Sequence, residues 1–517
     1  MLPWLSPWTG GPSTPAWRWI VSAACGVLLW ALAAWRPVAP AVPRGLAWAC
    51  AALAAWAVLS DGPVRPEHAM LAGGLVLIVI AATAARDPDI TRGLQAGLLV
   101  AAAATAAIGL LQYAGQASRF EPWVTPVAPG LAFGNLRQTN QYATFCWMGV
   151  ALVLWGGLQA PRAVRIALVA LLATGAAASV SRTGMLQGGV LLVLALLWRG
   201  GPWRERLLLC GVATLAYAGG TALLPVLLES LTGQAPTRTL WARLGGVDGC
   251  ASRLVLWSNV LHLIAQKPLA GWGWGELDYA HYVTPYEGPR FCEILDNAHN
   301  LPLQLAVELG APVALLACGG ALLWAWRQRP WREKRPLRQL AWALLAVILL
   351  HSLLEYPLWY GPFQLAFGAC LGWLLAPESR RTSPRRRSAF AALLLAGLAY
   401  AGWDYVRVSQ VYLAPQERRA AWADDPLTSA QRSWLFAGPA DFAALTLATP
   451  ASHNAAWMAS AARRLLHYSP EPRVIERLVE SASLLGRDDE AVLHLARYRA
   501  AFPREYDAWR LSWRQPD

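Results

Sequence analysis

The stretch GLQAGLLVAAAATAAIGLLQY, which runs from Gly93 to Tyr113, contains no charged side chain. A helix rises about 1.5 Å per residue, so about 20 apolar residues cross the ~30 Å hydrocarbon core of a bilayer. This stretch has that length and that composition. It is therefore expected to form a transmembrane helix.

The rest of the chain has the same apolar character. Of its 517 residues, 56% are hydrophobic, 15% are charged and 29 are tryptophan, a composition outside the range of ordinary soluble domains. The predicted fold class is therefore all-α, a polytopic membrane protein of about twelve transmembrane helices. We expect these spans at about 17–35, 46–59, 68–85, 93–113, 140–158, 164–180, 184–198, 207–227, 301–326, 340–354, 358–375 and 389–403.

The net charge of +13 comes largely from short basic clusters that lie between the apolar runs. This placement follows the positive-inside rule, so we expect a lipid bilayer around the chain and no nucleic-acid partner. The densest basic loops, WRQRPWREKRPLR (326–338) and SRRTSPRRRS (379–388), are predicted to be cytoplasmic. The long polar segment 228–298 and the C-terminal tail then lie outside, and the number of spans places the N-terminus outside as well.

Two domains are predicted from the change in composition. Residues 1–404 form a membrane body that includes the outside segment 228–298, and residues 405–517 form a helical domain on the same side. In this tail, apolar residues recur at helical spacing on both sides of a turn at Gly486. The pattern resembles a tetratricopeptide helix pair, and an irregular helical domain is the alternative.

Eight cysteines are scattered along the chain without a metal-ligand spacing such as CxxC, so we expect no zinc site. Only Cys250 and Cys292 share the outside segment. An oxidising periplasm permits a disulfide between them. The other cysteines lie in or beside predicted spans, where cysteine behaves as a small apolar residue.

Polar residues gather at the outside ends of the predicted spans. Polar groups close to hydrocarbon are costly, and successive outside ends share one membrane surface, so we expect these residues to form one active site. They are Gln138 and Asn140 in GNLRQTNQ, Arg182 in SRTG, Arg253 in ASRLVLW, Asn297, His299 and Asn300 in DNAHN, and Glu355 and Tyr356 in HSLLEYPLWY.

The residue types indicate one kind of reaction. Arg182 and Arg253 suit an anionic diphosphate, since a guanidinium forms bidentate, charge-assisted hydrogen bonds. A neutral His299 can accept a proton from a hydroxyl. Amides and a phenol can bind sugar hydroxyls. Together these residues predict transfer of a glycan from a lipid diphosphate to an acceptor hydroxyl.

A divalent metal is the usual alternative for such chemistry. The one Asp-x-Asp sequence, at Asp87 and Asp89, is flanked by arginines and is predicted to be cytoplasmic, away from the cluster. A metal site is therefore not expected. Acids scattered on the outside keep the metal alternative open; these are Asp61, Glu67, Asp278 and Asp296.

Six segments carry a family resemblance because they occur in a fixed order. They are GNLRQTNQYATF, SRTGML, SRLVLWSNVL with PLAGWGWGEL, NAHNLPLQLAVELG, HSLLEYPLWYGPF, and WDYVRVSQVYLAP at the start of the tail. In these segments the chain resembles the O-antigen ligase and polymerase superfamily of bacterial inner-membrane glycosyltransferases. It is most similar to the protein O-oligosaccharyltransferases of the PglL/PilO type, which implies a GT-C-like membrane fold.

The resemblance implies roles for individual residues. The essential histidine of the family falls on His299, its glutamine on Gln138, and its tyrosine on Tyr356, with Tyr360 as the less favoured choice. The diphosphate-binding arginines fall on Arg182 and Arg253. Asn140 and Asn300 lie in the same motifs and are expected to bind substrate.

The resemblance also implies the substrates. The donor is an undecaprenyl-diphosphate-linked oligosaccharide, transferred at the periplasmic face of the inner membrane without a metal or other cofactor. The acceptor is a Ser or Thr hydroxyl of a periplasmic protein such as a pilin. Members of this family usually have nine spans before the long outside segment, whereas this chain has eight predicted ones.

Other functions are weighed against this one. An O-antigen ligase shares the chemistry but uses a sugar of the lipid A core as acceptor, and a polymerase joins glycan repeats. The EYPLWY element and the helical tail favour a protein acceptor, because a folded tail can dock a protein. A lipid or polysaccharide transporter should have polar residues near the membrane midplane and on both sides, whereas here they gather on one side.

Overall fold

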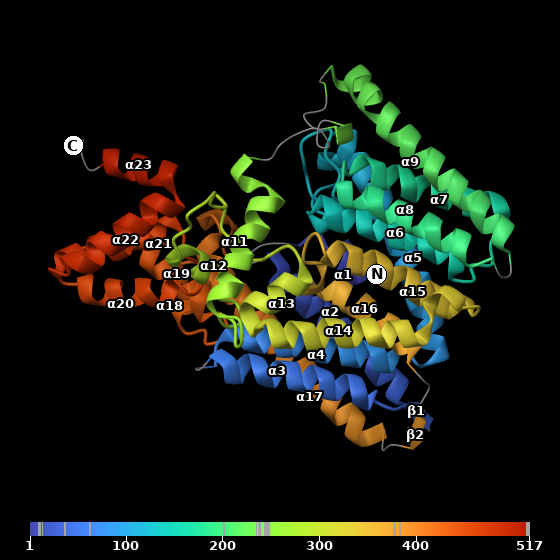
Figure 1. Cartoon of the computed structure of the whole chain (residues 1–517), viewed down its shortest axis with the longest axis horizontal. Coiled ribbons are helices and arrows are strands. Elements are labelled where there is room, and N and C mark those ends of the chain that lie inside the picture. The colour runs from blue at the N-terminus through green and yellow to red at the C-terminus, as the bar shows by residue number, and fades with distance from the viewer. Residues whose placement is uncertain are drawn as a thin grey trace.

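The computed structural model describes residues 1–8, 12, 14–35, 38–61, 64–199, 202–233, 235, 239–241, 249–375, 379–381 and 384–512. Within these residues the chain is helical, which confirms the predicted helical class (Figure 1). The exception is a small antiparallel sheet of β1 (Val38–Pro40) and β2 (Ser379–Arg381), in which Val38 pairs with Arg381. The sheet joins the chain after the helix Thr14–Ala34 to the chain before the helix Pro384–Ser409.

Every predicted span coincides with one or two helices. The helices of this part are α1 (Leu2–Leu5), α2 (Thr14–Ala34), α3 (Arg44–Asp61), α4 (Pro66–Ala84), α5 (Pro88–Tyr113), α6 (Thr139–Trp155), α7 (Arg162–Ala178), α8 (Arg182–Leu197), α9 (Trp203–Thr232), α13 (Leu301–Leu309), α14 (Ala311–Gln328), α15 (Pro336–Ser352), α16 (Gly361–Leu374) and α17 (Pro384–Ser409). Among the described residues, 5 helices are long and apolar enough to cross a membrane. The larger number of spans stays a prediction.

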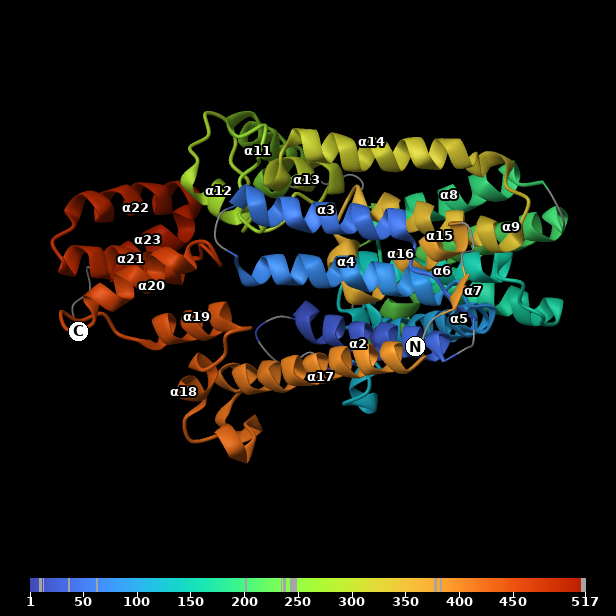
Figure 2. The same ribbon diagram turned by 90° about the horizontal axis from the view of Figure 1, so that it is seen from below.

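Short 3-10 helices connect several of these elements. They are η1 (Ala117–Phe120), η2 (Gly134–Leu136), η3 (Gly249–Ala251), η4 (Pro330–Arg332), η5 (Pro357–Trp359), η6 (Gln410–Tyr412), η7 (Pro415–Glu417) and η8 (Ala420–Trp422). The long helices run side by side in Figure 2, with the tail helices at one end.

Helix α6 lies at the centre of the body. Nearly all of its side chains are buried, which fits a sequence that is apolar on every face of the helix. On the neighbouring α5, Gly109 leaves room for the ring of Tyr142, whose hydroxyl donates to the carbonyl oxygen of Ala106 at 3.2 Å. This close packing fixes the outer end of α6, where Gln138 and Asn140 lie.

The predicted single span at 301–326 is wrong, because the helix breaks at Gly310. This residue has φ +92°, and a Cβ there would lie 2.0 Å from the carbonyl oxygen of Leu269. The next residue, Ala311, donates its N–H to Pro268 at 2.8 Å. The turn at 268–271 thus inserts between α13 and α14, so that α13 is a short helix of its own.

The outside segment 228–298 is more helical than the polar loop that the sequence predicted. It contains the end of α9, η3, α11 (Arg253–Gln266) and α12 (Leu277–Val283). Residues 234, 236–238 and 242–248 of the predicted segment lie outside the described residues. The helices give the segment an apolar core of its own, which includes Leu256 and Val260.

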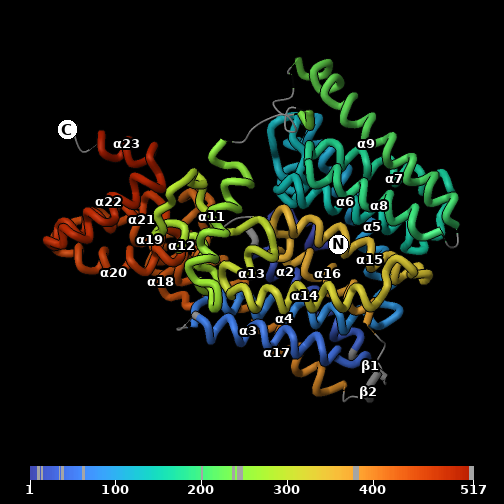
Figure 3. The backbone as a smooth tube through the Cα atoms, in the orientation of Figure 1, coloured from blue at the N-terminus to red at the C-terminus, as the bar shows by residue number. Residues whose placement is uncertain are grey.

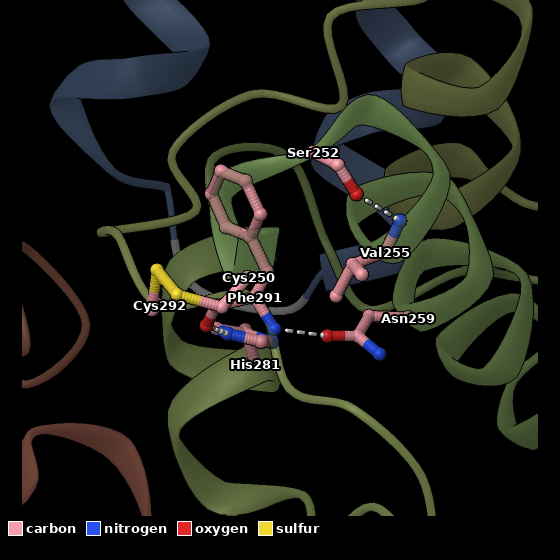
Figure 4. The surroundings of a disulfide bond; sticks show 7 residues. All are labelled: Cys250, Ser252, Val255, Asn259, His281, Phe291 and Cys292. Atoms are coloured by element: carbon pink, nitrogen blue, oxygen red, sulfur yellow. Dashed lines mark hydrogen bonds between the residues drawn. A yellow bond between two sulfur atoms is a disulfide. The ribbon is translucent and has the colours of Figure 1, made fainter. Parts of the chain in front are cut away.

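A disulfide joins Cys250 to Cys292, with the two Cα atoms 5.6 Å apart (Figure 4). Next to it, the N–H of Phe291 donates to Asn259 Oδ1 at 2.8 Å, and the carbonyl oxygen of Phe291 lies 3.1 Å from His281 Nε2. Burial, with Arg290 nearby, lowers the pKa of His281 to about 3. His281 is therefore a neutral structural link that ties the chain before α13 to α12.

The tail forms helices α18 (Pro426–Gln431), α19 (Ala437–Leu447), α20 (Ala455–Leu465), α21 (Pro472–Leu484), α22 (Asp488–Ala501) and α23 (Pro503–Ser512). The predicted helix pair corresponds to α21 and α22, with Gly486 at φ +67° in the turn. Whether the tail is a tetratricopeptide domain stays a prediction. Helix α17 continues to Ser409, so the predicted domain boundary at 404/405 falls within a helix.

Helix α12 connects the body to the tail. Its Tyr282 packs into the apolar core of the tail, and the Tyr282 hydroxyl lies 2.8 Å from His494 Nδ1. The tube in Figure 3 shows α11 and α12 between the tail and the remaining helices. The segment 228–298 and the tail are therefore packed against each other through α12.

Candidate active site

The predicted site residues lie at the N-terminal ends of several helices. Gln138 caps α6, Arg182 is the first residue of α8, Arg253 is the first residue of α11, and Asn300 caps α13. Backbone N–H groups at a helix N-terminus are unpaired and carry partial positive charge. Helices α8, α11 and α13 thus begin close to a common group of polar side chains.

Glu355 is the centre of this group. It lies between α15 and η5, and its Oε2 accepts a hydrogen bond from His299 Nδ1 at 2.8 Å. Its Oε1 accepts from Arg253 Nη2 at 2.5 Å and from Asn140 Nδ2 at 3.3 Å. Residues from α6, α11 and the start of α13 are therefore joined through one carboxylate.

The Glu355 carboxylate is ionised at neutral pH. Burial favours the protonated acid, but the hydrogen bond from His299 and the charge of Arg253 outweigh it and lower the pKa of Glu355. The side chain is only 12% exposed. A carboxylate accepts hydrogen bonds and cannot donate one, so Nδ1 of His299 must carry the proton of this bond.

The backbone holds His299 in a fixed position. His299 has φ +50°, a conformation that is uncommon for residues other than glycine and costs about 1–3 kcal/mol. Its N–H donates to Asn297 Oδ1 at 2.8 Å. The flanking Ala298 donates its N–H to Gln304 Oε1 at 2.6 Å and accepts from Trp257 Nε1 at 3.1 Å. With Nδ1 bonded to Glu355, the remaining ring nitrogen Nε2 is the one that a substrate can use.

Asn140 is oriented by a residue that the sequence reasoning missed. The hydroxyl of Ser181 donates to Asn140 Oδ1 at 2.6 Å and accepts the N–H of Gly184 at 3.0 Å as the cap of α8. This bond to the carbonyl oxygen turns the NH2 group of Asn140 toward Glu355. The available signal was the Ser-Arg-Thr-Gly sequence, in which the serine is a typical helix cap.

A second missed feature is a buried polar layer beneath Asn140. The hydroxyl of Thr144 donates to the carbonyl oxygen of Asn140 at 2.7 Å and lies 2.9 Å from His351 Nδ1. Gln187 Nε2 donates to the Thr144 oxygen at 2.8 Å. These residues face one another from α6, α8 and α15, and they hold the outer ends of these helices together.

Gln138 and Asn300 have structural partners of their own. Gln138 Oε1 accepts the N–H of Gln141 at 2.6 Å, and in the described structure its side chain makes no hydrogen bond to the Glu355 group. Asn300 Oδ1 accepts the N–H of Leu303 at 3.1 Å, while its Nδ2 donates to the Leu353 carbonyl oxygen at 3.1 Å. Asn300 therefore ties α13 to the chain next to Glu355.

Tyr356 lies against the histidine. The two ring centroids are 5.1 Å apart at 78°, an edge-to-face contact, and the centroid of the Tyr360 ring lies 6.1 Å from that of Tyr356. Burial raises the pKa of Tyr356 well above its ordinary value, so it stays a neutral phenol. Of the two tyrosines considered from the sequence, Tyr356 is the one whose ring contacts His299.

The two predicted diphosphate arginines differ in their surroundings. Arg253 is ion-paired with Glu355, and its side chain is 34% exposed. Arg182 is half-buried and directly follows Ser181. The positive charge of Arg253 is thus largely offset by the carboxylate.

Asp87 of the Asp-x-Asp sequence has a structural role. Asp87 caps α5, because its Oδ1 accepts the N–H groups of Asp89 at 2.9 Å and Ile90 at 3.1 Å. Among the described residues, no three His, Cys, Asp or Glu side chains are grouped as a metal site requires. Independence from a metal stays a prediction from the family resemblance.

Three family models match successive parts of the chain. The protein glycosylation ligase model matches residues 132–155, the O-antigen ligase model matches 167–318, and the model for the C-terminal part of a virulence factor membrane-bound polymerase matches 339–515. The first range contains Asn140, the second contains Arg253 and His299, and the third contains Glu355. Each model therefore covers a different part of the hydrogen-bonded group.

A curated relative is the general O-oligosaccharyltransferase of Acinetobacter baylyi, which is 26% identical over 265 residues. The alignment covers 48% of this chain and 45% of the relative, so it spans less than half of that protein. The resemblance that the sequence motifs indicated is confirmed: this chain is similar to the O-antigen ligases and to the protein glycosylation ligases.

Proposed function

We propose that this chain is a membrane glycosyltransferase that moves an oligosaccharide from a lipid diphosphate to a hydroxyl group of a protein. The observation that carries the proposal is the hydrogen-bonded group in which Glu355 holds both His299 and Arg253. It combines a base for the acceptor with a cation for the leaving group. We propose undecaprenyl diphosphate as the lipid carrier and a Ser or Thr side chain as the acceptor, as the family resemblance implies.

His299 is the proposed general base. Its Nδ1–H is bonded to Glu355, so the lone pair of the neutral ring lies on Nε2. Nε2 takes the proton of the acceptor hydroxyl as the oxygen attacks the anomeric carbon of the donor. Glu355 keeps the ring in this tautomer and stabilises the imidazolium that forms, in the way a carboxylate serves the histidine of a serine hydrolase.

The leaving group is the lipid diphosphate. As the new glycosidic bond forms, the bond from the anomeric carbon to the diphosphate oxygen breaks, and negative charge grows on that oxygen. Arg182 and Arg253 are the proposed ligands of this charge. Within the described residues, Arg253 is bonded to Glu355 through one nitrogen, so its other N–H groups can link the base to the diphosphate.

A protein acceptor is favoured by the position of the tail. Tyr282 of α12 lies in the apolar core of the tail, which joins the folded tail to the segment that contains Arg253. A protein that docks on the tail is thereby held beside the proposed site. The match to the protein glycosylation ligase model over residues 132–155 supports the same acceptor.

An O-antigen ligase is the second candidate function, and the match to that family model over residues 167–318 favours it. A polymerase that joins glycan repeats is a third, suggested by the model over residues 339–515. All three share the proposed base and leaving group. They differ in the acceptor, and therefore in which product is lost when the chain is absent.

The proposed site faces the periplasm of the inner membrane. The disulfide between Cys250 and Cys292 supports this sidedness, because disulfides persist in oxidising compartments. The basic loop around η4 on the opposite side supports it as well.

A deletion strain tests the proposed acceptor. Glycopeptides of periplasmic proteins and the lipopolysaccharide profile are measured in the parent strain and in the deletion strain. They are also measured in the deletion strain that carries the His299→Ala or the His262→Ala variant in trans. His262 is an exposed histidine on α11 and is the control. Loss of glycopeptides with intact lipopolysaccharide in the deletion and in His299→Ala supports the proposal. Loss of O-antigen with normal glycopeptides contradicts it and favours the second candidate.

A further inference from the structure

Helices α2 and α17 pack against each other along an apolar groove. The groove has a volume of about 520 Å³ and is lined on one side by Trp17, Ile20 and Ala24 of α2 and on the other by Leu395, Leu398 and Trp403 of α17. The two helices lie side by side in Figure 2. None of the groove residues belongs to α6, α8, α11 or α13, which build the candidate active site.

One end of the groove is aromatic. Trp8 and Trp17 contact each other edge to face, with ring centroids 4.6 Å apart, and Trp403 lines the groove across from them. Tryptophan is enriched at the level of the lipid headgroups in membrane proteins, because one part of its ring system is apolar and the other carries an N–H. These rings therefore mark the headgroup level of a lipid that lies in the groove.

An arginine completes the same end. Arg419 lines the groove, and its side chain is exposed. The chain after α17 turns back here, because the N–H of Arg419 donates to Gln410 Oε1 at 2.8 Å while Gln410 Nε2 donates to the Val406 carbonyl oxygen at 2.8 Å. These bonds fix the backbone of Arg419 beside Val406, so its side chain lines the groove from there.

We propose that this groove binds one anionic phospholipid, with an acyl chain between α2 and α17 and its phosphate at Arg419. An arginine forms bidentate, charge-assisted hydrogen bonds with a phosphate. The apolar walls suit an acyl chain, and the aromatic end suits the glycerol region. The site is separate from the one proposed for the donor lipid, and it rests on the membrane setting but not on glycan transfer.

Gly402 gives a way to close the groove. A Cβ at this position would meet Trp17 at 3.5 Å and Ile20 at 3.9 Å, both ordinary contact distances. The Cβ of a side chain at 402 therefore fits without a shift of the backbone, and the three further carbons of a leucine are expected to occupy part of the groove. Gly397, on the same helix, has nothing within 4 Å of an added Cβ, so Gly397→Leu is a matched control that adds the same side chain elsewhere.

Photo-crosslinking of the full chain in nanodiscs tests the proposal. The probes are phosphatidylglycerol and phosphatidylcholine that carry the same diazirine acyl chain, and crosslinked peptides are mapped by mass spectrometry. We expect peptides of α2 and α17 to be labelled several-fold more by phosphatidylglycerol than by phosphatidylcholine. Gly402→Leu should reduce labelling by both lipids, whereas Arg419→Gln should remove only the preference for the anionic one.

The control variants are Gly397→Leu and Arg385→Gln. Arg385 lies at the other end of α17. Both variants should be labelled by the two lipids as the wild-type chain is. Equal labelling by the two lipids in the wild-type chain overturns the proposed phosphate contact. Labelling that Gly402→Leu leaves unchanged, or no labelling of α2 and α17 peptides, overturns the groove as a lipid site. Crosslinking does not depend on transferase activity. The proposed lipid site can therefore fail this test while the proposed function holds, and the proposed function can fail while the lipid site holds.

Discussion

Glu355 accepts hydrogen bonds from both His299 and Arg253, which lie 56 and 102 positions away in the sequence. The proposed base and one proposed diphosphate ligand are thereby held by the same carboxylate. Protonation, orientation and charge at the site are coupled through this residue. Each of these properties gives a separate prediction.

Removing the charge of Glu355 should reduce turnover. Glu355→Gln keeps the size of the side chain but removes its negative charge. His299 and Arg253 then face an NH2 group or a neutral oxygen in place of the carboxylate. The proton on Nδ1 of His299 is therefore no longer fixed. We expect kcat to fall on the order of 10²- to 10⁴-fold, because a histidine in the wrong tautomer cannot act as the general base. Initial rates of glycan transfer measure this, and Glu287→Gln on the exposed outside segment is the control. A wild-type kcat in Glu355→Gln would rule out the orienting role.

The lowered pKa of Glu355 gives the sign of a pH effect on stability. A carboxyl whose pKa is lower in the folded chain contributes stability that is complete above its ordinary pKa of about 4.3 and is lost as the pH falls toward the lowered value. The difference in Tm between the wild-type chain and Glu355→Gln should therefore shrink as the pH falls below about 5. Thermal unfolding in detergent over a pH series measures it. A difference that grows as the pH falls below about 5 contradicts the assigned ion pair.

Both arginines should contribute to donor binding, and Arg253 should have a second effect. Arg182→Ala is expected to weaken donor binding about tenfold or more, which is about 1.4 kcal/mol. Arg253→Ala should weaken donor binding and also lower kcat, because Glu355 loses its ion-pair partner. Binding of the lipid-linked oligosaccharide and single-turnover rates separate the two effects, with Arg119→Ala in η1 as the control. Wild-type donor affinity in both variants would remove the proposed roles.

The break at Gly310 should be essential for the fold. Alanine there would be held at φ +92° with its Cβ against the Leu269 carbonyl oxygen, so Gly310→Ala should destabilise the chain by about 1–3 kcal/mol. Gly319→Ala, on α14 with open space around it, should leave stability nearly unchanged. Unfolding midpoints of the two variants measure the contrast. Equal midpoints would mean that α13 and α14 can form one continuous helix.

Sidedness can be tested through the cysteines. If the outside segment is periplasmic, Cys250 and Cys292 should resist a maleimide reagent in intact cells until a reductant is added. The disulfide closes a loop with a sequence separation of 42, and its loss should cost about 2–4 kcal/mol. In the Cys250→Ser variant, Cys292 loses its disulfide partner and should react without a reductant. Labelling of Cys250 or Cys292 in the wild-type chain without a reductant, mapped apart from the six other cysteines, would contradict the assigned compartment.

Much of the site could be predicted because its residues begin helices. Serine, asparagine and glutamine at helix starts are recognisable signals, and Ser181, Asn300 and Gln138 all act as caps. The helical class followed from the length of the apolar runs. These features depend on residues that are close together in the sequence.

The remaining features depend on residues that are distant in the sequence. Asn140 and Glu355 are 215 positions apart, and no local pattern indicates that one carboxylate collects donors from three elements. The break at Gly310 had a signal in the Gly-Ala-Pro sequence, but the apolar run continued across it. The strands β1 and β2 have three residues each, too few for a period to be recognised.

The most direct test of the central claim is glycan transfer by the purified chain in liposomes, with a lipid-diphosphate-linked oligosaccharide as donor and a protein acceptor. The account predicts that the wild-type chain glycosylates the acceptor, and that His299→Ala binds the donor with unchanged affinity but transfers no glycan. Transfer by His299→Ala at the wild-type rate would contradict it.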